Sequence, residues 1–196
     1  MINRQHFYDE VRTSFGTKLT QKQIDGFEAI LNTWEQSGLT DLRWLAYMLA
    51  TAWHETDKKM QAIEEYGKGR GRKYGKPSKN GKVYYGRGLV QLTWPENYRS
   101  MGNILGVELY DHPEIALDLN IAVKIMFEGM TTAKSFRGDF TGKHLGMYFN
   151  EGTEDWVNAR RIINLLDKAE LIASYGKRFY KSLTTQPPEG ITQPPI

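Results

Sequence analysis

Two carboxylate positions, Glu55 and the adjacent pair Glu64 and Glu65, are the strongest candidates for chemistry in this sequence. Apolar residues recur at helical spacing before the first position; they are Leu42, Leu45, Leu49, Ala52 and Trp53. We expect Thr40 to cap this helix, since Thr is a favoured N-cap residue. No Gly or Pro interrupts residues 41–55, so the helix should be continuous. Glu55 would then end a core-packed helix, where partial burial and the helix dipole favour a protonated carboxyl. Such a group suits a general acid.

A segment crowded with aromatic and hydrogen-bonding residues, 84–94, follows the second acidic position. In an extended segment, alternation places Gln91 and Thr93 on the same face as Leu89. Buried polar groups need partners, which argues against a purely structural strand. Two carboxylates beside such a segment suggest cleavage of a glycosidic bond. On periodicity alone, Glu55 also fits a solvated helix-end carboxylate, and Glu64 with Glu65 fits a solvated charge pair.

A metal site is not expected. His54-Glu55 invites comparison with the zinc motif His-Glu-x-x-His, but Lys58 occupies the position of the second histidine. The remaining histidines are widely spaced along the chain. We therefore expect no metal ion and no organic cofactor.

The composition is that of an ordinary soluble globular domain, with 40% hydrophobic and 25% charged residues among 196. A formal net charge of +3 does not predict nucleic-acid binding. The excess is local, since residues 68–87 carry Lys and Arg but no acidic residue. There is no cysteine, hence no disulfide, and neither a signal-peptide pattern nor a run of ~18 apolar residues. We expect synthesis in the cytoplasm without stable membrane insertion.

The pattern predicts a mainly α-helical, two-lobed domain over residues 1–182 with little or no β-structure. Helices are expected through the first 55 residues, including one that opens with a capping box at Thr20 and Gln23. Residues 66–83 are expected to form a long loop. Further helical regions are expected at 99–117, with a turn at residues 111–113, and at 121–127 and 154–180. Residues 183–196 repeat Thr-Gln-Pro-Pro and are expected to form an extended tail.

Taken together, these segments resemble glycoside hydrolase family 19, a chitinase-like family of the lysozyme superfamily, in its compact phage endolysin branch. The resemblance covers roughly residues 20–183. Its most specific part is the string Tyr-Tyr-Gly-Arg-Gly-Leu-Val-Gln-Leu-Thr-Trp at 84–94. Ala-Trp-His-Glu-Thr at 52–56 and Ala-Arg-Arg-Ile-Ile-Asn at 159–164 match two further motifs. The resemblance implies a lysozyme-like fold with a cleft between two lobes.

The resemblance also implies roles for individual residues. Glu55 matches the general acid, Glu64 matches the general base that activates water, and Thr93 matches a hydroxyl that helps to hold that water. The choice of Glu64 over Glu65 stays open. The matched positions that contact substrate or shape the cleft are Tyr85, Arg87, Gln91, Asn97 and Asn164. The family continues after its acid with Gly-Gly, whereas Asp57-Lys58 follow here, so the turn between the acids is expected to differ.

The resulting interpretation is an endolysin that hydrolyses β-1,4 bonds of peptidoglycan with inversion. It would be made in the host cytoplasm, act on the cell wall after release and depend on a holin. We expect a monomer that binds glycan strands and no nucleic acid. The basic loop favours the anionic wall over chitin, but a chitinase would share every catalytic residue. A lytic transglycosylase would not need the second carboxylate, and a non-catalytic wall-binding module would explain only the aromatics and the basic loop.

Overall fold

The computed structural model describes residues 1–131 and 140–184. Within these ranges the chain is mainly helical, as predicted, and strands are limited to two short pairs. The α-helices are α1 (Arg4–Phe15), α2 (Gln21–Ser37), α3 (Leu42–Glu55), α4 (Pro95–Leu105), α5 (Leu119–Met130) and α6 (Ala169–Thr184). Short 3-10 helices are η1 (Lys73–Gly75), η2 (Pro113–Leu117), η3 (Leu145–Met147) and η4 (Asn158–Ile162). The strands are β1 (Ile63–Glu64), β2 (Arg87–Gly88), β3 (Phe149–Asn150) and β4 (Thr153–Glu154), paired antiparallel as β1–β2 and β3–β4.

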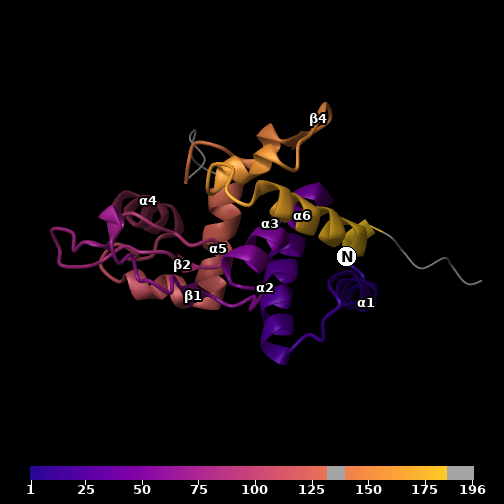
Figure 1. The fold of residues 1–196 in the computed structure, drawn as a ribbon, viewed down its shortest axis with the longest axis horizontal. Coiled ribbons are helices and arrows are strands. Elements are labelled where there is room, and N and C mark those ends of the chain that lie inside the picture. The colour runs from indigo at the N-terminus through magenta and orange to yellow at the C-terminus, as the bar shows by residue number, and fades with distance from the viewer. Residues whose placement is uncertain (132–139, 185–196) are drawn as a thin grey trace, which may run out of the picture.

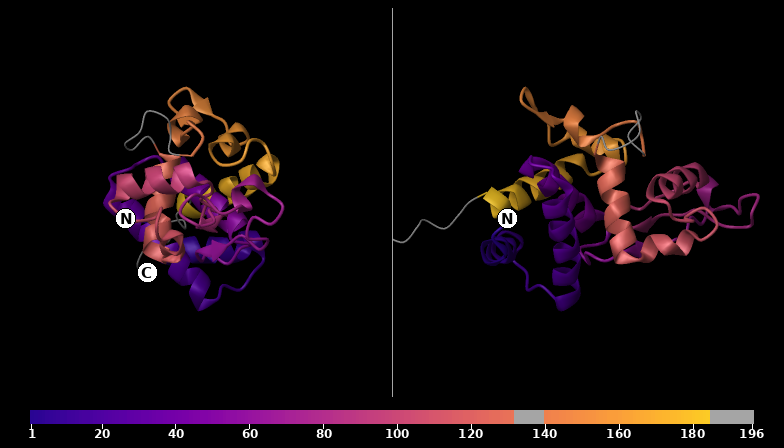
Figure 2. Two further views of the ribbon diagram at one scale, coloured as in Figure 1. Left: turned by 90° about the vertical axis from the view of Figure 1, so that its left-hand side faces the viewer. Right: turned by 180° about the vertical axis from the view of Figure 1, so that it is seen from behind.

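Two lobes can be followed in Figures 1 and 2. One end of the molecule carries α1 and the end of α6, and the other carries α4, the β1–β2 pair and the loop between these two strands. Helices α2, α3 and α5 lie between the two ends. Helix α3 packs against α6, and α5 contacts both α2 and α4. The loop between β1 and β2 is therefore carried by a helical frame.

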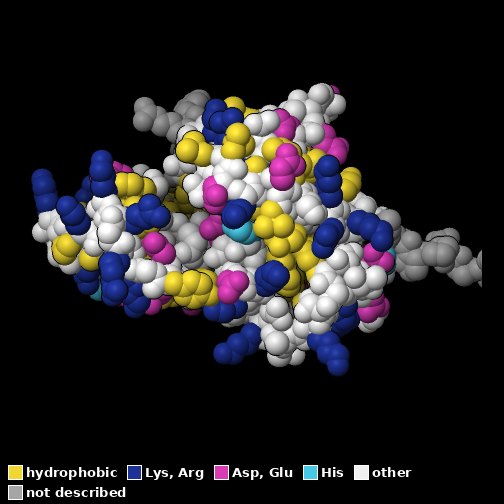
Figure 3. All heavy atoms as spheres, in the orientation of Figure 1, with side chains coloured by type: hydrophobic (Ala, Val, Ile, Leu, Met, Phe, Trp, Pro, Cys, Tyr) yellow, Lys and Arg dark blue, Asp and Glu magenta, His cyan; other side chains and the backbone are white. Residues whose placement is uncertain are grey.

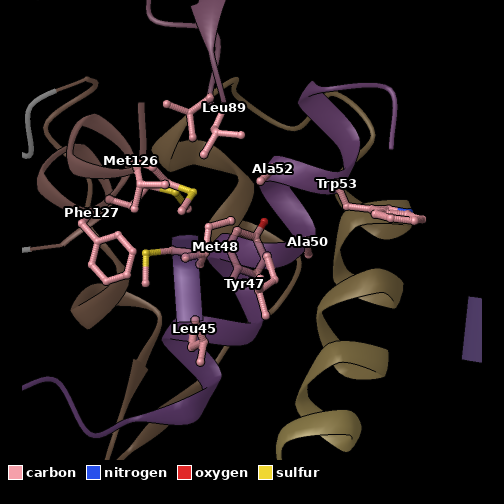
Figure 4. Packing of buried hydrophobic residues seen from close by; sticks show 14 of the residues in the cluster. Leu45, Tyr47, Met48, Ala50, Ala52, Trp53, Leu89, Met126 and Phe127 are labelled. Carbon is pink, nitrogen blue, oxygen red and sulfur yellow. The ribbon is translucent and has the colours of Figure 1, made fainter. Parts of the chain in front are cut away.

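Helix α3 is the centre of the core. Every residue from Leu45 to Trp53 is buried, as expected for a helix that is covered on all sides. Trp53 points toward α6, whereas Met48 lies beside Met126 and Phe127 of α5 (Figure 4). This packing fixes the end of α3, and with it the position of Glu55.

Several expected boundaries move in the structure. Asp41, rather than Thr40, caps α3, because its side chain accepts a hydrogen bond from the backbone N–H of Arg43. Helix α4 runs from Pro95 to Leu105 and is capped by Gly106 in the left-handed conformation, and a loop that includes the expected turn at Asp111 leads to η2. The region 154–180 divides into β4, η4, a loop and α6.

The predicted division into a domain and a tail falls at the end of α6. Leu183 and Thr184 belong to that helix. The rest of the predicted Pro-rich tail, residues 185–196, lies outside the described residues.

Candidate active site

A cleft of about 410 Å³ runs between the two lobes. Its lining residues are Glu55, Glu65, Tyr74, Gly86, Val90, Gln91, Leu92, Thr93, Trp94, Asn97, Phe140, Thr141, Ile163 and Asn164. They come from the end of α3, the loop before η1, the segment leading into α4, and the region around η4. Five predicted site residues are among them: Glu55, Gln91, Thr93, Asn97 and Asn164.

Glu55 sits in the cleft beside a buried arginine. Its Oε1 atom accepts a hydrogen bond of 2.7 Å from Arg160 Nη1, and the two side chains are 14% and 2% exposed. Arg160 Nε also donates to the backbone oxygen of Asp167 at 2.8 Å. The apolar surroundings expected from the helix pattern are thus replaced by a buried ion pair. The motif at 159–164 contained this arginine, but it did not indicate that Arg160 would pair with Glu55.

Glu65, rather than Glu64, joins Glu55 on the cleft wall. Its Oε2 accepts a hydrogen bond from the backbone N–H of Gly86 at 3.2 Å, and its Oε1 accepts one from the hydroxyl of Tyr74 at 3.1 Å. Its own backbone N–H donates to the Gly86 oxygen at 2.8 Å. The β1–β2 pairing therefore continues past Glu64 and presents Glu65 to the cleft.

Glu64 lies outside the cleft lining, because adjacent side chains of an extended segment point to opposite faces. The hydroxyl of Tyr85 donates a hydrogen bond to its Oε1, and Lys68 Nζ lies 2.9 Å from its Oε2. The bond from Tyr85 and the charge of Lys68 hold the pKa of Glu64 below its usual value. We therefore replace Glu64 with Glu65 as the candidate base.

Tyr85 and Arg87, which are expected to shape the cleft, are not among the residues that line it. The guanidinium of Arg87 stacks over the Tyr85 ring at 3.7 Å. It also donates to the Val83 oxygen and the Tyr98 hydroxyl, both at 3.1 Å. Arg87 is buried. Its guanidinium therefore holds together residues 83, 85 and 98 without lining the cleft.

Gln91 and Thr93 reach the cleft through a turn, not through strand alternation. Gln91 has a φ of 55°, and β2 ends at Gly88. The side-chain amide of Gln91 donates to the backbone oxygens of Ile63 and Gly88, each at 3.2 Å. A Cβ at Gly86 would lie 2.7 Å from Gln91 Oε1, so a larger residue there would displace the Gln91 amide. The Gln91 amide thus links β1 to β2.

Thr93 and Asn97 are placed at the start of α4. The Thr93 hydroxyl donates to the Gln91 backbone oxygen at 2.7 Å, which leaves its lone pairs able to accept a hydrogen bond from water. Asn97 Nδ2 donates to the Thr93 backbone oxygen at 2.8 Å. Both groups therefore keep unused hydrogen-bonding capacity toward the cleft.

The turn after Glu55 forms without the expected glycines. Asp57 and Lys58 have φ values of 51° and 64°, in the left-handed region that favours glycine. The Lys58 N–H donates to the Trp53 oxygen at 2.7 Å, and Gln23 Nε2 donates to the Lys58 oxygen at 2.9 Å. These bonds hold a conformation that is costly for both side chains.

The described residues contain no cluster of three or more His, Cys, Asp or Glu side chains that could hold a metal ion. Within the same ranges, no helix has the length and apolarity needed to cross a bilayer.

Comparison with known proteins identifies the family of the chain. The model of glycoside hydrolase family 19, described as class I chitinase, matches residues 45–145, more than half of the chain. Endochitinase 1 of Theobroma cacao is 42% identical over 60 residues, which make up 30% of this chain and 19% of the relative. The aligned regions span less than half the length of the first curated relatives that the chain matches.

Solved structures extend the likeness to almost the whole fold. A bacterial family 19 chitinase has a TM-score of 0.56 and 23% identity, covering 96% of this chain and 98% of its own. Chitinase C from Streptomyces griseus has a TM-score of 0.59 and 22% identity, covering 94% and 93%. At these identities the structural likeness concerns the fold, whereas the family model concerns the sequence that carries the cleft. The chain therefore belongs to glycoside hydrolase family 19, the family of class I chitinases.

Proposed function

We propose that this protein hydrolyses β-1,4 glycosidic bonds of an N-acetylated glycan, with Glu55 as the general acid and Glu65 as the general base. The observation that supports this proposal is that two carboxylates from different elements line one cleft. The same cleft presents the hydroxyl of Thr93 and the amides of Asn97 and Asn164. Such a set can bind sugar hydroxyls and acetamido groups while the carboxylates exchange protons.

In the proposed reaction, Glu55 donates its proton to the departing glycosidic oxygen. Glu65 accepts a proton from a water molecule, which attacks the anomeric carbon from the opposite side and inverts it. Thr93 accepts a hydrogen bond from this water and so helps to aim it. Arg160, 2.7 Å from Glu55, stabilises the carboxylate that remains after proton transfer. No cofactor takes part in these steps.

We further propose peptidoglycan as the substrate and host-cell lysis as the role. The protein would act as a monomeric phage endolysin, made in the host cytoplasm and released to the wall with the help of a holin. The supporting observation is the row of exposed Lys and Arg side chains on residues 68–79, because bacterial walls are net anionic. Lys and Arg side chains gather at this end of the molecule, on the left of Figure 3.

Chitin is the second candidate substrate, because the matched relatives include proteins named endochitinases. Clearing of permeabilised bacterial cells and release of reducing sugar from chitin distinguish the two substrates. We expect the purified protein to clear the cells faster than it degrades chitin. If chitin is degraded faster, chitin becomes the proposed substrate in place of peptidoglycan, and the assignment of the catalytic residues is unchanged.

Replacing Glu55 or Glu65 with Gln tests the catalytic assignment. Each amide keeps the shape of the carboxyl but cannot transfer the proton, so activity should fall by ~10²–10⁴-fold. Glu64→Gln is the matched control, since Glu64 lies outside the cleft lining, and it should keep most of the activity. Near wild-type turnover by folded Glu65→Gln, together with loss in Glu64→Gln, would return the base to Glu64.

A further inference from the structure

Tyr74 is the residue through which the basic loop 66–83 reaches the catalytic cleft. Its hydroxyl donates to Glu65 Oε1 at 3.1 Å. The other oxygen of Glu65 is held by the backbone N–H of Gly86 at 3.2 Å. One carboxylate oxygen of Glu65 is thus held by the main chain of residues 84–94, and the other by a side chain of the loop.

The loop is folded so that Tyr74 arrives at this point. Short turns close it, with backbone hydrogen bonds of 2.9 Å from Arg72 N to Gly69 O and 3.1 Å from Gly75 N to Arg72 O. A Cβ at Gly75 would lie 1.8 Å from the Gly69 oxygen, so the chain passes against itself here. Gly69 itself has a φ of +73°. The path of the loop therefore depends on glycines that flank η1.

The ring of Tyr74 is fixed by a second contact. It packs edge-on against Trp94 with centroids 5.4 Å apart and an interplanar angle of 75°, a favoured aromatic geometry. Burial and the hydrogen bond to Glu65 raise the pKa of Tyr74. The hydroxyl therefore stays protonated and able to donate.

We propose that Tyr74 is a positioning residue that holds Glu65 in the orientation needed to accept a proton from the attacking water. This inference rests on the proposed role of Glu65 as the base. Tyr74 occupies one lone pair of Glu65 Oε1 and leaves carboxylate lone pairs for the water. The loop then has two functions on opposite sides: exposed cations outward and a catalytic support inward.

Tyr74→Phe tests the proposal, because the ring and its Trp94 contact remain while the hydroxyl is removed. The assay uses chitin hexasaccharide or solubilised peptidoglycan, whichever the wild-type protein cleaves faster. We expect kcat to fall between about ten- and a hundredfold, as for a lost hydrogen bond to a charged group, with KM changed less than about twofold. Tyr66→Phe is the matched control, since the Tyr66 hydroxyl bonds to Asp57 and Lys59 instead. Its kcat should stay at the wild-type value.

A pair of glycine substitutions tests the same contact without touching the tyrosine. Gly75→Ala should displace η1 and lower kcat as Tyr74→Phe does, because the added Cβ collides with the main chain at Gly69. Gly67→Ala is the matched control in the same loop, since a Cβ there meets nothing within 4 Å. It should leave kcat unchanged.

A double-mutant cycle separates positioning from a general structural effect. If Tyr74 acts through Glu65, Tyr74→Phe should cost less than about twofold in residual turnover once Glu65→Gln is present. Equal losses in both backgrounds, a wild-type kcat for Tyr74→Phe, or a change confined to KM would each overturn the proposal. Near wild-type activity of Glu65→Gln alone would instead overturn the base assignment, so the two failures are read from different variants.

Discussion

At the scale of single residues, neighbouring side chains differ in whether they line the cleft. Glu65 faces the cleft, whereas Glu64 is held behind it by Tyr85 and Lys68. Asn97 lines the cleft while the preceding residue, Glu96, is exposed. Chemistry at this site therefore depends on which face of the backbone each residue occupies, and single substitutions can separate the roles.

Thr93→Val is the sharpest substitution at this scale. Valine keeps the shape but removes the hydroxyl that would aim the water, so the rate should fall by ~10²-fold or less while both carboxylates remain. Thr93→Ser should keep most of the activity. The wild-type products should carry the inverted anomer, measured by proton NMR before mutarotation. A retained anomer or a 1,6-anhydro product would show that no directed water attacks the anomeric carbon, and would contradict the proposed role of Thr93.

At the scale of elements, the loop between β1 and β2 combines a structured inner side with a charged outer side. Its cations do not form one uniform patch. Lys68 pairs with Glu64 at 2.9 Å, and Arg87 at its far end is buried. Arg70, Lys76 and Lys79 are exposed and are therefore available to an anionic polymer.

Removing Arg70, Lys76 and Lys79 together should weaken binding to wall fragments and flatten its salt dependence. All three are exposed, and exposed charges are screened over ~8 Å at physiological ionic strength. Cosedimentation with purified wall at several salt concentrations measures this effect. Turnover of a soluble oligosaccharide should change little.

The matched control for the loop variant removes Lys18, Lys22 and Lys177, which are exposed residues of the α1–α2 connection, α2 and α6. Either triple change to Ser takes the formal net charge of +3 to zero. Equal weakening by both variants would show that net charge, not the loop, attracts the wall.

At the scale of the whole molecule, two partly buried histidines make the stability of the fold depend on pH. Burial lowers the pKa of both His54, near the end of α3, and His144, before η3. Above pH ~6.5 both are neutral in the folded and unfolded chains and add no pH dependence. Below that value the unfolded chain binds protons that the folded chain does not, so the free energy of unfolding falls.

We therefore expect Tm to decrease as the pH is lowered from 7.5 to 5, before the carboxylates protonate. Glu64, whose pKa is lowered by its bond to Tyr85, adds to the loss only at still lower pH. Replacing His54 and His144 with Gln should reduce the decrease between pH 7.5 and 5, measured by thermal unfolding. An unchanged slope in this double variant would place the pH dependence elsewhere.

Local pattern was sufficient for much of this protein. Helical periodicity predicted α2, α3 and α5, and the capping box at Thr20 marked the start of α2, because these features depend on neighbours in sequence. The same pattern ended α3 at Glu55, which lines the cleft as expected. The motif at 84–94 indicated the family, since its residue types are specific. Four residues that the family motifs assigned to substrate or water also line the cleft: Gln91, Thr93, Asn97 and Asn164.

Contacts between distant segments decided the rest. The choice between Glu64 and Glu65 depends on how β1 pairs with β2, and a shift of one residue reverses the face. Arg160 meets Glu55, and Tyr74 meets Glu65, only because η4 and the loop fold back onto the cleft. Arg87 is buried because its guanidinium donates a hydrogen bond to the main-chain oxygen of Val83. No local periodicity encodes such contacts, so only the tertiary structure could assign them.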